Sequence, residues 1–256
     1  MEKDPKGELE NQRVVGSVNI SCGECYMCEM GIEKHCRNMK AIGMRDRDGA
    51  FAEYMTLPRE NIYTVPEEIS DREAVLVEPL AAGVEIIEEN HIKPTDEVVI
   101  LGDGKLGHSI ARVLWAAEKD PILIGKHQNK LDRVAELGID TYLLGNYQGP
   151  ADYVVECTGS SSGLQTALDL IRPQGTIVLK TTTSDLNDIN MSKVAVDEIE
   201  IVGSRCGPFA PTLKMMENNE LALDKMIDDV YDFKDSLKAF KRAKENKILK
   251  VLLKIN

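Results

Sequence analysis

The chain has 256 residues, a formal net charge of −12 and 29% charged residues. Such acidity argues against nucleic acid or an anionic membrane as a partner, and no apolar run approaches the roughly 18 residues of a transmembrane helix. The polar N-terminus, MEKDPKGELENQ, lacks the apolar segment of a secretory signal, so we expect a cytoplasmic protein.

Four of the six cysteines lie in one short stretch, SCGECYMCEMGIEKHC. Their spacing, C-x2-C-x2-C-x7-C, is typical of a structural zinc site with four thiolate ligands. An iron–sulfur cluster is an alternative, although the bacterial ferredoxin spacing has a shorter last gap followed by proline. Free thiols or disulfides are a third possibility, and His35 could compete as a ligand. We predict a structural zinc on Cys22, Cys25, Cys28 and Cys36.

The stretch 96–114, DEVVILGDGKLGHSIARVL, has the pattern of a strand, a glycine turn and a helix. In the motif G-x-G-x-x-G, Gly102 permits the tight turn, Gly104 lets the backbone approach a pyrophosphate, and Gly107 lets the helix pack on the strand. The pyrophosphate would lie at the positive helix N-terminus, beside Lys105 and Leu106. The sequence therefore predicts a dinucleotide-binding turn.

The following strand, 121–125, bears on the choice between NAD and NADP. An NAD-binding version carries an acid at the strand end to bind the ribose 2′-hydroxyl, whereas this strand ends at Gly125. The missing carboxylate removes repulsion of a 2′-phosphate, and Lys126 and His127 could attract one. Lys126 could equally be a solvated loop residue. We predict that NADP is favoured and leave NAD open.

Strands and helices continue to alternate after this point, which predicts a doubly wound parallel α/β sheet. The expected elements are a helix that begins at 130 and ends at Gly138, a strand at 152–159, a helix at 162–175 closed by Pro173 and Gly175, and strands at 176–181 and 199–205. Ligands of such sheets lie at the carboxyl ends of the strands. This places six further residues near the cofactor: Thr158, Gly159, Lys180, Thr181, Ser204 and Arg205.

The two ends of the chain are expected to fold together. Strand-like segments at 13–20 and 50–64 flank the cysteine stretch, and the C-terminus has a short helix at 210–219 followed by strand, helix and strand at 228–233, 234–246 and 250–256. We predict a discontinuous β-rich domain formed by residues 1–80 and 208–256. The dinucleotide-binding unit, residues 81–207, would be inserted into it.

The order of motifs resembles the zinc-dependent medium-chain alcohol dehydrogenase family, in particular its threonine, sorbitol and glucose dehydrogenase-like branch. The motifs are RVVGSVNISCGECYMC, DGAFAEY, EPLAAGVEI, VVILGDGKLG, ECTGS and GSRCGPF, and the match runs from about residue 12 to the C-terminus. The resemblance implies a Rossmann unit inserted in a GroES-like domain. It also implies hydride transfer between an alcohol or polyol and NAD(P) at a catalytic zinc, and a homodimer or homotetramer joined through the strand at 199–205.

The catalytic zinc of that family raises a difficulty. The resemblance places an early Cys and the His of a Gly-His-Glu motif before the strand equivalent to 13–20, and no Gly-His-Glu occurs in this sequence. The matching residue that remains is Glu78, either at the catalytic zinc or simply an acid at a helix N-terminus. We therefore expect the chain to lack the first catalytic zinc ligands. A catalytically incomplete NADP(H)- and zinc-binding protein, or a redox or zinc-sensing regulator, are the alternatives.

Overall fold

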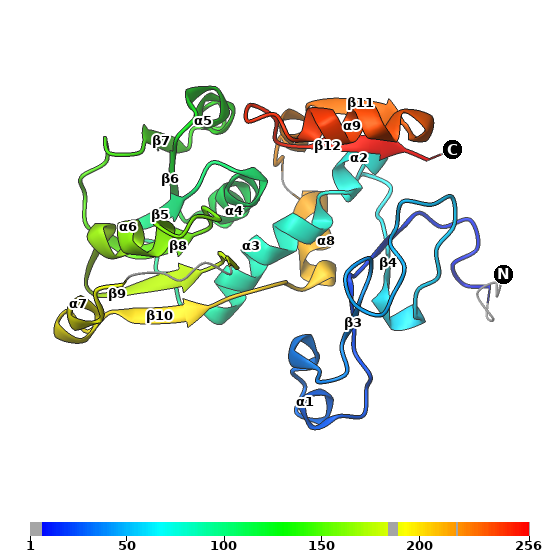
Figure 1. The fold of residues 1–256 in the computed structure, drawn as a ribbon, viewed down its shortest axis with the longest axis horizontal. Helices are drawn as coiled ribbons and strands as arrows, with labels where there is room; N and C mark the ends of the chain where they lie inside the picture. The colour runs from blue at the N-terminus through cyan, green and yellow to red at the C-terminus, as the bar shows by residue number, and fades with distance from the viewer. Residues whose placement is uncertain (1–6, 184–188, 219, 256) are drawn as a thin grey trace.

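The computed structural model describes residues 7–183, 189–218 and 220–255. A six-stranded parallel sheet forms one side of the molecule, at the left of Figure 1. The strand order is β10-β9-β8-β5-β6-β7. In chain order the strands are β5 (Val98–Leu101), β6 (Ile122–Gly125), β7 (Asp140–Leu143), β8 (Ala151–Glu156), β9 (Ile171–Leu179) and β10 (Glu200–Gly203). The chain runs from β5 to one edge and then fills the other side, so the predicted doubly wound fold is confirmed.

Helices cover both faces of this sheet because its central strands are apolar on both faces. In β5 all four side chains are buried; Val98 and Ile100 pack with one cluster of apolar residues, and Val99 and Leu101 with another. The alternation follows from the two-residue period of a strand. The first cluster includes residues of α4 (Lys105–Ala116) and α5 (Gln128–Ala135), and the second includes residues of α6 (Gly163–Leu170) and of the segment around α7 (Met191–Val196).

Two helices, α3 (Val77–Glu89) and α8 (Phe209–Asn218), lie between the sheet and the remaining chain, as Figure 1 shows. Both contribute to a third apolar core, which combines residues between Val65 and Val84, Val113 of α4, and residues between Phe209 and Ile227. Segments far apart in the sequence therefore share one core. The predicted division into 1–80 with 208–256 and 81–207 stays a prediction.

The rest of the chain forms small two-stranded pairs. Their strands are β1 (Val14–Gly16) with β4 (Ile62–Thr64), β2 (Asn19–Ile20) with β3 (Lys40–Ala41), and β11 (Asp229–Asp232) with β12 (Val251–Lys254). The short helices are α1 (Tyr26–Glu29), α2 (Asp71–Ala74) and α9 (Ser236–Ala243), with 3-10 turns η1 (Glu33–His35), η2 (Arg59–Asn61), η3 (Leu223–Met226) and η4 (Phe233–Asp235). No helix among the described residues is long and apolar enough to cross a membrane.

Some predicted elements have different limits in the structure. Of the predicted strand 50–64, only Ile62–Thr64 (β4) forms a strand. No described strand pairs with residues 50–58, where Phe51 and Tyr54 are 64% and 71% exposed. The predicted helix 162–175 ends at Leu170 because the chain enters β9 at Ile171. The strand β7 and the helix α7 were not predicted, since neither has a strong apolar period.

Candidate functional site

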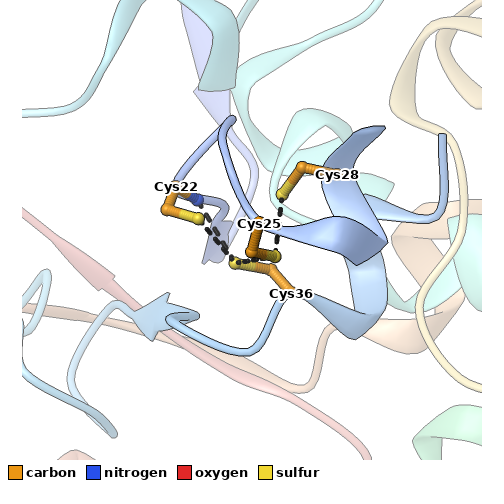
Figure 2. Close-up of side chains that lie close together, drawn as sticks. All are labelled: Cys22, Cys25, Cys28 and Cys36. Atoms are coloured by element: carbon orange, nitrogen blue, oxygen red, sulfur yellow. Dashed lines mark hydrogen bonds between the residues drawn. The ribbon is translucent and has the colours of Figure 1, made fainter. Parts of the chain in front are cut away.

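The four predicted zinc ligands converge in one lobe (Figure 2). The Sγ atom of Cys36 lies 3.5 Å from that of Cys22 and 3.8 Å from that of Cys25, and Cys25 Sγ lies 3.6 Å from Cys28 Sγ. The four sulfur atoms all lie within 4.8 Å of one another. Cys25 precedes α1, Cys28 lies within it, and Cys36 follows η1, so two short helical turns bring the ligands together.

These distances fit a single tetrahedral ion. With zinc–sulfur bonds of about 2.3 Å, the edges of a sulfur tetrahedron are about 3.8 Å long. An iron–sulfur cluster needs room for several metal and sulfide atoms between its thiolates, which this spacing does not provide. The exposed His35 is not part of the group. The four thiols therefore have the arrangement of a closed four-ligand zinc site, and the zinc itself stays a prediction.

The charges of these thiols also favour a bound cation. A hydrogen bond from the Arg37 backbone, together with one from Cys28, lowers the pKa of Cys25 to about 6. Burial and the hydrogen bond with Cys25 raise the pKa of Cys28 to about 11. Neighbouring thiols thus compete for negative charge when no ion balances them, and a divalent cation would let all four ionise.

One side chain attaches the cysteine lobe to the rest of the molecule. Lys34, in η1, forms ion pairs with Glu85 and Glu89 near the C-terminal end of α3. The Glu85 side chain is only 8% exposed, and burial raises its pKa. The ammonium group of Lys34 therefore compensates a carboxylate that is otherwise costly to bury.

The glycine turn predicted to bind a dinucleotide has the expected geometry. Gly102 has φ of +128°, and a Cβ atom there would lie 2.9 Å from the carbonyl oxygen of Cys157. At Gly107 a Cβ atom would lie 1.8 Å from the Gly102 carbonyl oxygen. Gly104 precedes the first turn of α4, so the free backbone N–H groups of that helix face the turn. At Gly102 and Gly107 the neighbouring backbone leaves no room for a side chain. At Gly104 the space is open, as the approach of a pyrophosphate requires.

A first cavity of about 270 Å³ opens at the carboxyl ends of β5, β6 and β8. It contains six of the predicted cofactor residues: Gly102, Gly104, Gly125, Lys126, His127 and Thr158. The Thr158 backbone N–H and hydroxyl both donate to Glu156 Oε1, at 2.8 and 2.6 Å, which fixes the turn after β8. The cavity lies where doubly wound sheets bind the adenosine half of a dinucleotide.

A second cavity, of about 250 Å³, contains six other predicted residues: Glu78, Lys105, Leu106, Lys180, Ser204 and Arg205. Lys180 is buried and donates a hydrogen bond to Ser204 Oγ at 2.7 Å, and burial lowers its pKa to about 8. Asn19 of β2 donates to Cys206 Sγ, at 3.0 Å, on the edge of the cavity. The second cavity thus lies between the start of α3, the start of α4 and the segments that follow β9 and β10.

Three predicted residues line neither cavity. Gly107 lies beneath the glycine turn, and the Gly159 N–H donates to Thr181 Oγ1 at 3.0 Å, joining the ends of β8 and β9. A larger hollow of about 740 Å³, bordered by acidic side chains, contains none of the predicted site residues. The predicted site residues therefore line the two cavities at the carboxyl end of the sheet and not the larger hollow.

Sequence reasoning missed Asp103, the residue between the first two glycines. Its carboxylate accepts hydrogen bonds from the backbone N–H groups of Lys126 and His127, both at 2.6 Å. An acid in a turn that binds phosphate is unusual, and that position alone could have drawn attention to it. Lys130, Ser160 and Cys206, which also line the cavities, gave no sequence signal.

Family models match two parts of the chain. A zinc-binding dehydrogenase model matches residues 104–220, and an alcohol dehydrogenase GroES-like domain model matches residues 6–67. The first match covers the region from the glycine turn to α8, and the second covers the cysteine lobe with the strands around it.

Curated relatives and solved structures agree with these matches. A sorbitol dehydrogenase of Halalkalibacterium halodurans is 28% identical, and the alignment covers 94% of this chain and 76% of the relative. A zinc-binding dehydrogenase of Sinorhizobium meliloti, solved with NADP, is 25% identical with a TM-score of 0.82 and the same coverage. The RspB dehydrogenase of Escherichia coli, solved with NADH, is 24% identical with a TM-score of 0.87, again with 94% and 76% coverage.

Proposed function

The chain belongs to the zinc-dependent medium-chain alcohol dehydrogenase family, and from this premise we propose that it is an oxidoreductase that transfers hydride between an alcohol or polyol and NAD(P). The observation that carries the proposal is the pair of cavities at the carboxyl end of the sheet, on either side of the glycine turn. The cavity with Gly125 would take the adenosine half, and the cavity with Lys180 the nicotinamide and substrate. Polyols are favoured because the matched relatives include sorbitol and xylulose enzymes.

The residues of the chain would hold the nucleotide in three ways. The N–H groups at the start of α4 would bind the pyrophosphate, with Lys105 beside them. Thr158, Gly159 and Thr181 would shape the site between the two halves. The buried Lys180, hydrogen-bonded to Ser204, would present a cation beside the nicotinamide. The finer prediction of NADP over NAD rests on Gly125, Lys126 and His127, and the position of Asp103 weighs against it.

The convergence of the four cysteine thiols supports the proposed structural zinc. The four cysteines would hold that ion and order their lobe. For a catalytic zinc, the four-cysteine group is the one metal-holding cluster in the described part of the chain, and the exposed Glu78 offers a single carboxylate. One carboxylate does not define a zinc site. The absence of the first catalytic zinc ligands stays a prediction.

This observation favours a second candidate function, a catalytically incomplete NAD(P)H- and zinc-binding protein. A redox or zinc-sensing regulator has less support, because the cysteine cluster fits a closed four-ligand site. All three candidates predict zinc in the cysteine lobe. Only the oxidoreductase predicts turnover.

The experiment that separates the candidates measures nucleotide binding and turnover on the same preparation. Reduction of NAD and NADP is followed with polyols, threonine, aldoses and simple alcohols, with and without added zinc. Polyol-dependent reduction that disappears in Glu78→Gln supports the oxidoreductase. Tight NADH or NADPH binding without turnover, unchanged by zinc, supports the incomplete protein. A chain that binds neither nucleotide contradicts both.

We also propose that the chain forms a homodimer or homotetramer through β10. This strand is at one edge of the sheet, and its Ile201 and Val202 are only partly buried. Its free edge can pair with the same strand of a second copy. Light scattering tests this, and a mass near the 28.4 kDa of one chain would contradict it.

A further inference from the structure

The side chain of Asp103 reaches from the glycine turn to the end of the neighbouring strand β6. It is 8% exposed and lines the first cavity. Its Oδ2 atom accepts hydrogen bonds from the backbone N–H groups of Lys126 and His127, and His127 Nδ1 lies 3.1 Å from both carboxylate oxygens. An acid from one turn is therefore held firmly at the end of the adjacent strand.

This carboxylate occupies the volume that a side chain at the strand end would need. A Cβ atom added to Gly125 would lie 2.4 Å from both Cβ and Oδ2 of Asp103. In an NAD-binding sheet, the acid at the end of this strand binds the ribose hydroxyls. Here the strand ends in glycine, and the acid reaches the same place from the glycine turn. The local sequence around β6 does not reveal it.

The same hydrogen bonds remove an anion site. The N–H groups of Lys126 and His127 immediately precede α5, where partial positive charge gathers. Without an acid beside them they would be natural donors to a 2′-phosphate. In this structure Asp103 already accepts from both.

We propose that Asp103 sets the nucleotide preference of the chain, favouring NAD(H) by accepting from the adenosine ribose hydroxyls and repelling the 2′-phosphate of NADP(H). The inference rests on the proposed function, because it assumes that the first cavity holds the adenosine half. It reverses the preference for NADP that Gly125, Lys126 and His127 predicted from the sequence.

Two basic residues of the first cavity, Lys126 and Lys130, allow the effect of the Asp103 charge on nucleotide preference to be tested. Lys126 is exposed and Lys130 is buried, and both line the first cavity with Asp103. While the carboxylate is present, its charge offsets theirs close to the ribose. Once it is neutral, the same two lysines can attract a 2′-phosphate. Asp103 therefore determines whether these basic groups select NADP.

The test compares the binding of NADH and NADPH to Asp103→Asn by nucleotide fluorescence, which needs no turnover. Asparagine keeps the size of the side chain and an oxygen to accept from the two backbone N–H groups. The matched control is Asp132→Asn, which removes one negative charge from the exposed face of α5 outside the cavity.

The unchanged chain should bind NADH more tightly than NADPH. In Asp103→Asn the affinity ratio should shift toward NADPH by about tenfold or more, as expected when a like charge within a few ångströms of the phosphate is removed. Asp132→Asn should leave the ratio within about twofold, because its charge is exposed and screened. An unchanged ratio in Asp103→Asn, an unmodified chain that prefers NADPH, or an equal shift in the control overturns the proposal.

A second pair of variants protects the test against simple loss of folding. Asp103→Gly alone should shift preference toward NADPH. Asp103→Gly combined with Gly125→Asp should restore the preference for NADH, because the space next to the strand end is then free for the new side chain. Failure of the double variant to restore it counts against the proposal. If no form of the protein, unmodified included, binds either nucleotide, the proposed function itself fails.

Discussion

The dinucleotide-binding sheet and the cysteine lobe, residues 22–36, are ordered by different forces. In the sheet, every side chain of β5 is buried, and Ile110, Leu114 and Leu123 are 0% exposed. In the lobe, α1 and η1 contain no buried residue, and Tyr26 and Met30 are 57% and 59% exposed. Burial of apolar area can hold the sheet together, whereas the lobe has almost none to bury. We therefore expect its order to depend on the zinc ion that its four thiols are predicted to bind.

The largest effect should therefore follow from removing one ligand of the lobe. Cys25→Ser leaves three thiols, which cannot complete a closed tetrahedral site. We expect elemental analysis to fall from about one zinc per chain toward none, with a loss of binding free energy of up to about 10 kcal/mol. Hydrogen exchange should become fast in residues 22–36 and stay slow in β5.

The control for this prediction is Cys206→Ser, which lies outside the cluster and should retain its zinc. Slow exchange in the lobe of a zinc-free Cys25→Ser protein would mean that packing, and not the ion, orders the lobe. Iron in place of zinc in the unmodified protein would contradict the predicted metal.

A smaller effect, on the pH dependence of folding stability, should come from His108 in α4, which packs on the dinucleotide-binding sheet. His108 is buried, and burial together with the nearby Arg112 lowers its pKa to about 3. Because the unfolded chain takes up this proton near pH 6.5 and the folded chain does not, stability falls as the pH decreases from about 7 toward 3. At pH 5 the loss from this residue is up to about 2 kcal/mol.

Urea unfolding of His108→Gln at several pH values measures this contribution. The variant should show a shallower fall in stability between pH 7 and pH 4 than the unmodified chain. His91→Gln, a change at an exposed position, should leave the fall unchanged. Parallel pH profiles for the unmodified chain and His108→Gln would mean that the imidazole is protonated without cost in the folded state.

The smallest of the three effects concerns the ion pairs of Lys34, which connect the cysteine lobe to α3. In Lys34→Met the buried carboxylate of Glu85 loses its cation and remains beside Glu89. Because Lys34 is itself partly exposed, we expect a loss of about 1–2 kcal/mol in urea unfolding. The double variant Lys34→Met/Glu85→Gln should recover most of it, since no unpaired buried charge remains.

Lys40→Met, at an exposed position in the same flank, is the matched control and should change stability by less than about 0.5 kcal/mol. Equal losses in Lys34→Met and Lys40→Met would show that the ion pairs on α3 contribute nothing specific.

The sequence predicted the sheet, the glycine turn and the cysteine cluster because each depends on residues adjacent in the chain. Gly102, Gly104 and Gly107 act within one turn, and the four cysteines lie within one loop. The structure of residues 50–58 could not be predicted in this way, because a strand also needs a partner. The role of Asp103 was missed for a related reason, since its hydrogen bonds reach residues more than twenty positions later.

The third apolar core has a consequence for how the chain reaches its fold. Its two halves, between Val65 and Val84 and between Phe209 and Ile227, are separated in the sequence by all six strands of the sheet. Closing this loop before the sheet exists costs chain entropy that no contact within the sheet yet offsets. During synthesis the early half is made first, and its apolar surface stays exposed to solvent until the late half has been made. Folding of the N-terminal flank should be slow and should depend on the last quarter of the chain.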